Sequence, residues 1–364
     1  MVFLRGPSSV KGGAHDDHDP IESGGGARPY QVGALMMRYR LLGRTGLRVS
    51  QLFLGAMTYR ESSPEVRRVF DLYADAGGNV VDTASIYGES ENVVGELLQG
   101  RRDRFVLATK YTGSIDGTDP NAAGNHRKSL VRSLEQSLRR LRTDYVDLFW
   151  VHVWDRHTPV EETMRALDDA VSAGKVLYAG ISDAPAWVAS RANTLAEWRG
   201  WTPFAGLQVP YSLLSRDVER ELLPMAQAYG MSVAAWGVLA QGVLSGRYNA
   251  PDAAASRRDP GSLTERERTA ARAVVEVAAE LGVTASQVAI AWVLRRGVHP
   301  ILGASTVEQL KDNLAATGVE LPGEAARRLE SAVGFELGFP GDFIDQVDRS
   351  PGIYGEAVDR LDGR

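Results

Sequence analysis

Cysteine is absent from the 364 residues of this sequence, and lysine is scarce, with five residues against 36 arginines. The absence of cysteine excludes disulfides, cysteine nucleophiles, thiolate zinc sites and iron–sulfur clusters. It is also typical of a reducing compartment, so we expect a cytoplasmic protein. No uninterrupted run of about 18 apolar residues occurs, so no segment is predicted to be a transmembrane helix.

An excess of positive charge is also missing. The formal net charge is −5 at pH 7, so no basic surface for nucleic acid or an anionic membrane is expected. The motifs GxGxxG and GxxxxGK[ST] do not occur, which disfavours a Rossmann or P-loop site without excluding a nucleotide bound in another way. We therefore expect a small-molecule ligand, no metal site, no nucleic-acid or membrane partner, and a chain compatible with a homo-oligomer.

The first 36 residues are rich in glycine, carry scattered acidic residues and lack the apolar core of a signal peptide. We expect residues 1–36 to be a disordered N-terminal extension. Met37 would be a natural start, and residues 37–364 are predicted to form the folded domain.

Short β-rich segments alternate with longer segments of helical periodicity from residue 51 onward. Strands are predicted at residues 51–55, 79–82, 105–110, 145–152, 176–182, 205–209, 232–236 and 300–304. Near-continuous apolar strands in this alternation indicate a parallel sheet that is buried on both faces. Eight such units in about 300 residues predict an α/β fold of the (β/α)8 TIM-barrel class. The main alternative is an open doubly wound sheet, which usually carries a glycine-rich turn after its first strand.

Other segments depart from the alternation. Residues 39–50 are predicted to form a β-hairpin that caps the floor of the barrel. A long loop is predicted at about residues 237–262, and loops of this length are often functional. Extra helices are predicted near the C-terminus, at residues 264–282, 284–297 and 322–333.

Polar side chains end three consecutive predicted strands. Asp82 ends the second strand, with Tyr87 in the loop that follows it, Lys110 ends the third, and His152 ends the fourth. Each residue alone has an ordinary explanation as a turn residue, a loop aromatic or a structural histidine. Because active sites of such barrels lie at the C-terminal ends of the strands, we expect these four to meet there.

These four residue types suit proton transfer to a carbonyl oxygen. A tyrosine hydroxyl has an ordinary pKa of about 10, and a neighbouring ammonium lowers it by stabilising the phenolate. A carboxylate paired with the lysine would hold the ammonium in place, and the histidine could orient the carbonyl oxygen. Electrophilic help of this kind, without a side-chain nucleophile, suits hydride addition.

Residues 38–335 resemble the aldo-keto reductases, with the segments in that family's order. The matching segments are LGRTGLRVS with LFLGAMTY, NVVDTASIYGESENVVGELL, FVLATK, YVDLFWVHVWD, GKVLYAGISDAPAW, LQVPYSLLSR, AAWGVLAQGVLSGRY and PILGASTVEQLKDNLAA. The pattern is most similar to bacterial members that resemble the potassium-channel β-subunits and the sugar-nucleotide reductases. The resemblance implies that Tyr87 is the general acid, that Lys110 and Asp82 tune it, and that His152 orients the carbonyl.

The resemblance also implies NADPH (NADP+), bound extended across the barrel mouth. In this assignment Ser182, Asp183 and Gln208 hold the carboxamide and Tyr211 stacks on the nicotinamide. The residues implied around the phosphates and the adenosine are Trp236, Gly237, Val238, Leu239, Gln241, Gly242, Arg247, Gly303, Ser305, Gln309 and Asn313. Trp154 and Tyr59 are expected in the substrate pocket.

Three features depart from the family's pattern in the cofactor segments. Many members carry asparagine where Asp183 stands, and Arg247 replaces a common lysine. Many also carry a basic residue beside Ser305 or Thr306 that pairs with the 2′-phosphate, whereas here the nearest is Lys311. We expect an NADPH-dependent reductase of an aldehyde or ketone. The alternatives are a reductase of a deoxysugar-nucleotide intermediate and an NADPH-binding regulatory protein.

Overall fold

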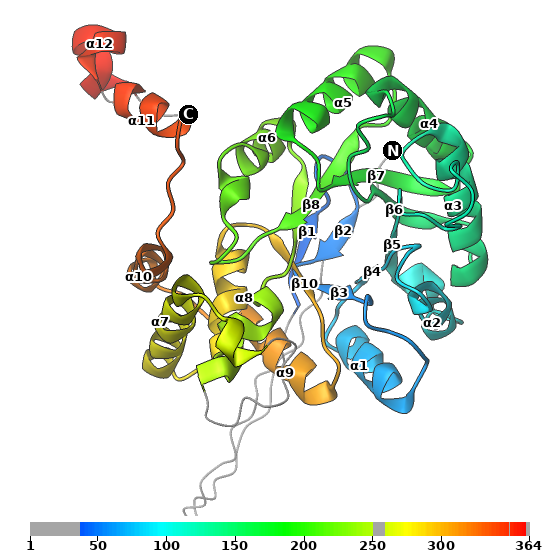
Figure 1. Ribbon diagram of the computed structural model, residues 1–364, viewed down its shortest axis with the longest axis horizontal. Coiled ribbons are helices and arrows are strands. Elements are labelled where there is room, and N and C mark those ends of the chain that lie inside the picture. The colour runs from blue at the N-terminus through cyan, green and yellow to red at the C-terminus, as the bar shows by residue number, and fades with distance from the viewer. Residues whose placement is uncertain (1–36, 250–258, 349, 362–364) are drawn as a thin grey trace, which may run out of the picture. The chain divides into compact units, whose positions relative to one another are not determined.

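The computed structural model describes residues 37–249, 259–348 and 350–361. The extension predicted at residues 1–36 and residues 250–258 of the predicted long loop lie outside this part of the chain. Eight parallel strands close into a barrel in the order β10-β3-β4-β5-β6-β7-β8-β9, which confirms the predicted fold class. Helices α1 to α6 lie outside these strands (Figure 1).

All eight predicted barrel strands are present. Their bounds are β3 (Phe53–Gly55), β4 (Val80–Asp82), β5 (Val106–Tyr111), β6 (Val146–Val151), β7 (Val176–Ser182), β8 (Phe204–Pro210), β9 (Ser232–Trp236) and β10 (His299–Leu302). The helices are α1 (Pro64–Asp75), α2 (Ser90–Leu97), α3 (Arg127–Leu141), α4 (Val160–Ser172), α5 (Ala186–Arg199), α6 (Leu222–Tyr229), α7 (Glu265–Leu281), α8 (Ala285–Arg295), α9 (Val307–Ala315), α10 (Gly323–Val333), α11 (Gly341–Asp348) and α12 (Pro351–Tyr354).

Side chains fill the interior of the barrel, which is therefore a packed core and not a pore. Trp150 of β6 is the largest of them and is fully buried. Gly180 and Gly206, on the next two strands, leave the space that its indole occupies. A methyl group at Gly180 would lie 2.3 Å from the Trp150 ring, and one at Gly206 would lie 2.9 Å from it. These two glycines are therefore required by a close approach of the tryptophan.

The predicted hairpin is formed by β1 (Tyr39–Leu41) and β2 (Arg48–Ser50), which pair antiparallel. Its turn residue Gly43 donates a backbone hydrogen bond to the hydroxyl of Ser232 at 2.8 Å. Ser232 begins β9, and Leu42 of the hairpin belongs to the cluster that fills the barrel interior. The hairpin thus closes the N-terminal end of the barrel, as predicted, and leaves the opposite end for the site.

The described part of the long loop after β9 folds into short 3-10 turns, η3 (Ala240–Ser245), η4 (Arg247–Asn249) and η5 (Pro260–Ser262). Helix α7 then begins with a capping box, in which Thr264 and Glu267 satisfy each other's backbone groups. Within the described residues no single helix is both long and apolar enough to cross a membrane, and α7 and α8 pass that test only together, as a pair bent by 95°.

Candidate active site

Asp82 and Lys110 form a buried ion pair at the C-terminal ends of β4 and β5. Asp82 is 4% exposed and Lys110 is 0% exposed. In the β4–β5 register Asp82 lies opposite Ala108, and Lys110 is two positions farther along β5, so it projects from the same face as Ala108. The ammonium of Lys110 donates to Asp82 Oδ2 and, at 2.8 Å, to the carbonyl oxygen of Thr83. The amide of Gln208 donates to Asp82 Oδ1 at 3.0 Å, so both carboxylate oxygens accept a hydrogen bond.

Tyr87 and His152 lie beside this ion pair. The Tyr87 hydroxyl is 3.4 Å from His152 Nε2, a long hydrogen bond, and the two rings meet edge to face at 5.6 Å. The ammonium of Lys110 is 5.0 Å from the centre of the Tyr87 ring. The structure therefore brings together all four side chains predicted to meet at the barrel mouth.

Burial raises the pKa of the Tyr87 hydroxyl above its ordinary value, and the positive charge of Lys110 opposes this shift only in part. The sequence predicted a lowered pKa, but the net shift is upward. Burial destabilises the phenolate by more than the nearby ammonium of Lys110 stabilises it. Tyr87 therefore keeps its proton at neutral pH. A protonated phenol is the form that a proton donor needs.

His152 is neutral at physiological pH. Burial, aided by the charge of Lys110, lowers its pKa to about 4. Its Nδ1 atom is buried and accepts or donates no hydrogen bond among the described residues. A neutral imidazole at this position can hold an oxygen through Nε2 without competing with Tyr87 for the proton.

Arg60, which was not among the predicted site residues, connects two loops at the site. Its Nη1 atom donates to the carbonyl oxygen of Tyr87 at 2.9 Å and to that of Met57 at 3.2 Å. These loops follow β4 and β3. Arg60 is one of many exposed arginines, so nothing in the sequence distinguished it from the others.

Asp183 has a left-handed backbone, with a φ of 45°. Asparagine and aspartate tolerate this conformation better than other residues with a side chain, so either residue type suits this position. Its Oδ1 atom accepts a hydrogen bond from Trp236 Nε1 at 3.3 Å. Burial raises the pKa of Asp183, although the hydrogen bond from Trp236 acts in the opposite direction.

The loop after β9 turns its backbone sharply. Positive φ angles occur at Gly237 (70°), Ala240 (47°), Gln241 (58°) and Gly242 (93°). Turns with such left-handed residues point successive N–H groups toward a common concavity, which favours an anion. Within this loop the N–H groups of Ala240 and Gly242 donate to the carbonyl oxygens of Gly237 and Leu239, each at 2.8 Å, so these two groups are used by the turns themselves.

The predicted cofactor residues differ in exposure. The exposed ones are Trp236, Gly237, Gln241, Arg247, Gly303 and Ser305. The partly buried ones are Asp183, Leu239, Gly242 and Gln309. The buried ones are Ser182, Gln208, Tyr211, Val238 and Asn313.

A family model for the "Aldo/keto reductase family" matches residues 51–333. The chain belongs to the aldo/keto reductase family. Among its relatives are a norsolorinic acid reductase of Emericella nidulans, 41% identical over 82% of each chain, and an aryl-alcohol dehydrogenase of Pestalotiopsis microspora, 39% identical over 85% of this chain and 86% of the relative. An aldo-keto reductase of Aspergillus calidoustus is 37% identical over 84% of this chain and 85% of the relative.

The comparison corrects the expected branch of the aldo/keto reductase family. These three relatives are fungal, and none is named as a channel β-subunit or a sugar-nucleotide reductase. The resemblance to the bacterial and channel-subunit branch is therefore not supported.

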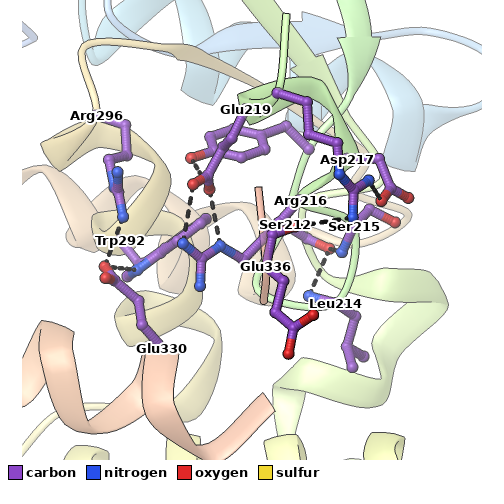
Figure 2. Close-up of polar contacts among 12 residues, drawn as sticks. Ser212, Leu214, Ser215, Arg216, Asp217, Glu219, Trp292, Arg296, Glu330 and Glu336 are labelled. Atoms are coloured by element: carbon purple, nitrogen blue, oxygen red, sulfur yellow. Dashed lines mark hydrogen bonds and ion pairs between the residues drawn. The ribbon is translucent and has the colours of Figure 1, made fainter. Parts of the chain in front are cut away.

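Tyr211 of this aldo/keto reductase is not placed for the stacking role expected from the sequence. Its side chain is fully buried and its ring lies 5.1 Å from that of Trp292. Its hydroxyl donates to Glu219 Oε1 at 2.8 Å. Arg216 donates to both oxygens of Glu219, at 2.8 and 2.9 Å (Figure 2). Trp292 in turn donates to Glu330 of α10 at 3.0 Å. The ring is therefore enclosed between β8 and the C-terminal helices.

Exposed apolar side chains surround the barrel mouth of the reductase. They come from the end of one strand, β9, or from the loops and helix starts that follow four others, and are 42–55% exposed: Met57, Ile86, Val153, Trp187 and Trp236. Trp154, expected in the pocket, is partly buried and meets Trp187 edge to face at 5.4 Å. Tyr59 was expected there too, but it is only 2% exposed and lies in the core. The Tyr59 side chain therefore faces the core and does not line the mouth, because tertiary packing decides which way a loop side chain points.

Proposed function

We propose that this protein catalyses NADPH-dependent reduction of an aryl aldehyde or aryl ketone, with Tyr87 as the general acid. The observation that carries the proposal is the position of the Tyr87 hydroxyl, 3.4 Å from His152 Nε2 and beside the buried Lys110–Asp82 pair. A carbonyl oxygen that approaches both atoms would be polarised by two hydrogen-bond donors.

The side chains have separate tasks in this proposal. His152, neutral and protonated at Nε2, donates a hydrogen bond to the carbonyl oxygen and orients it. Tyr87 transfers its proton to that oxygen as charge develops on it. Lys110 then stabilises the phenolate that remains, and Asp82 with Gln208 keeps the ammonium in position. NADPH, when bound, supplies the hydride that reaches the carbonyl carbon.

The residues present fit such a cofactor. The pyrophosphate would lie over the Gly237–Gly242 loop, because a Cβ added at Gly237 or at Gly303 would have no other atom within 4 Å, so space is open there. Ser182 and Asp183 would bind the carboxamide. Trp236, exposed and held by Asp183, offers the aromatic face that the buried Tyr211 does not.

An aryl substrate is favoured by the apolar rim of the mouth, because aromatic rings bind best where apolar and aromatic side chains surround a few polar groups. The names of two relatives agree, since one is called a norsolorinic acid reductase and another an aryl-alcohol dehydrogenase. The expected substrate is a planar aromatic compound whose carbonyl group reaches Tyr87.

Consumption of NADPH in the presence of 4-nitrobenzaldehyde tests the proposal. The variant Tyr87→Phe is expected to lose at least about 100-fold in kcat, the usual contribution of general acid catalysis, while it still binds NADPH. Tyr145→Phe serves as the control, because this tyrosine contacts Asp103 near the opposite ends of the strands. Equal rates for Tyr87→Phe and the wild type would refute the role of Tyr87. Tight NADPH binding without reduction of any aryl or aliphatic carbonyl would favour an NADPH-binding regulatory protein instead.

A further inference from the structure

A carboxylate from helix α1 occupies the N-terminal end of helix α9. Glu65 Oε1 accepts a hydrogen bond from the backbone N–H of Val307 at 2.9 Å, although 242 positions separate the two residues. Val307 is the first residue of α9, and Glu65 is in the first turn of α1. Closure of the barrel between β10 and β3 brings these two helices side by side, as Figure 1 shows.

The neighbouring donors of α9 are also used by the chain itself. The N–H of Ser305 donates to Gln309 Oε1 at 2.9 Å, and the N–H of Gln309 donates to Thr306 Oγ1 at 3.2 Å. Three backbone N–H groups at this helix end, those of Ser305, Val307 and Gln309, therefore already donate hydrogen bonds to side chains of the protein. A phosphate bound here would have to displace them or lie beside the Glu65 carboxylate.

We propose that Glu65 is a specificity-determining residue that weakens binding of the 2′-phosphate of NADPH relative to the 2′-hydroxyl of NADH. The inference rests on the proposed function, in which Ser305 and the start of α9 bind the adenosine end of the cofactor. A dianionic phosphate is repelled by the carboxylate and competes with it for the Val307 N–H. A ribose hydroxyl can instead donate a hydrogen bond to the same carboxylate.

Nearby cations do not cancel this effect. Arg68 pairs with the other oxygen of Glu65, but its side chain is 69% exposed, so water and salt screen its charge. No lysine or arginine lies between residues 303 and 310, and Lys311, the first in α9, is exposed. The Glu65 carboxylate thus directly contacts the backbone of this helix end, and the exposed Glu308 in the first turn of α9 adds further negative charge.

The variant Glu65→Gln separates specificity from helix capping. Its amide oxygen can still accept from the Val307 N–H, while the negative charge is removed. Asp71→Asn is the matched control, because it removes one negative charge from the same helix, where Asp71 pairs with Arg101. Thermal unfolding without ligand checks that both variants keep the fold.

Dissociation constants for NADPH and NADH, measured by quenching of tryptophan fluorescence, test the proposal without reference to turnover. In Glu65→Gln the ratio of the NADH constant to the NADPH constant is expected to rise at least about fivefold, through tighter NADPH binding. Adenosine 2′,5′-bisphosphate is expected to gain similarly, whereas AMP is not. Asp71→Asn is expected to leave the ratio unchanged.

An unchanged ratio in Glu65→Gln, or weaker NADPH binding, would overturn the role of Glu65 and leave the proposed function intact. An equal gain in Asp71→Asn would also overturn it, since the effect would then reflect overall charge. If the wild type bound neither dinucleotide, the proposed function itself would be wrong, and the inference with it.

Discussion

The side-chain amide of Gln208 donates a hydrogen bond to the carboxylate of Asp82 across 3.0 Å, although 126 positions separate the two residues in the sequence. Asp82 ends β4 and Gln208 lies on β8, so the contact spans the mouth of the barrel. The other oxygen of Asp82 binds Lys110. Asp82 therefore couples the group beside Tyr87 to a residue assigned to the nicotinamide, and its substitution is expected to affect both.

Removal of the charge on Asp82 is expected to destabilise the protein strongly. In Asp82→Asn the ammonium of Lys110 stays buried without its counter-ion, and such a change typically costs about 3–5 kcal/mol of unfolding free energy. The double variant Asp82→Asn with Lys110→Met removes both charges and is expected to be more stable than Asp82→Asn alone. Guanidinium chloride unfolding of the ligand-free protein measures both. A cost below about 1 kcal/mol for Asp82→Asn would show that water reaches the lysine.

Arg60 is expected to position Tyr87. In Arg60→Ala the carbonyl oxygen of Tyr87 loses its 2.9 Å hydrogen bond, and the loop that carries the phenol is freed. Because small displacements of a catalytic group are costly, kcat should fall about ten- to 100-fold while the dissociation constant for NADPH stays the same. Arg67→Ala, which breaks a surface pair with Glu96, is the control. A change confined to KM would instead place Arg60 in substrate binding.

The pKa of His152 predicts a dependence of stability on pH. Its value of about 4 in the folded protein lies below the ordinary 6.5, so between these values the unfolded chain binds the extra proton. The contribution of the neutral His152 to the unfolding free energy is therefore fully present above about pH 6.5 and is lost as the pH falls toward 4. Wild type should lose about 2 kcal/mol more than His152→Asn between pH 7 and pH 5. Burial also lowers the pKa of His299 to about 4. Because both proteins contain His299, its contribution cancels when the loss in the variant is subtracted from the loss in the wild type. Equal losses in the two proteins would mean that His152 titrates normally.

Trp187 is expected to contribute to recognition of aryl substrates. In Trp187→Ala the KM for 4-nitrobenzaldehyde should rise about five- to tenfold, because an exposed aromatic contact at the mouth is lost. The KM for propanal, which is too small to span the rim, should change less than about twofold. Trp198→Ala is the control, since Trp198 is 82% exposed near the other end of α5. A similar rise for both aldehydes would argue against an aryl-binding role.

Much of the architecture followed from the sequence, because local patterns decide it. Apolar runs placed all eight barrel strands, and glycine with polar turn residues separated them from the helices. The C-terminal ends of parallel strands lie at one end of a barrel, so the polar residues that end them must lie near one another. By that rule the sequence alone predicts that Asp82, Lys110, His152 and the adjacent Tyr87 lie together.

The direction of each side chain and the balance of forces on it could not be found in this way. Tyr211 was expected at the cofactor, but contacts with Glu219 and Trp292, 8 and 81 positions away, enclose it in the core. Tyr59 likewise faces inward. For Tyr87, the sign of the pKa shift depends on how deeply the barrel buries the phenol, which is a property of the packed molecule.

The sequence by itself thus determined the barrel, its hairpin and the meeting of four reactive side chains. The periodicity of apolar residues, the order of the strands along the chain and the residues that end them can all be found in the sequence. Only the tertiary structure decided which side chains that are distant in the sequence contact one another. Glu65 and Val307 illustrate this most clearly: 242 positions apart, they touch because the closed barrel places its first and last helices next to each other. Ring closure creates contacts that no local pattern contains, and one of them is the contact to which we assign a role in distinguishing NADPH from NADH.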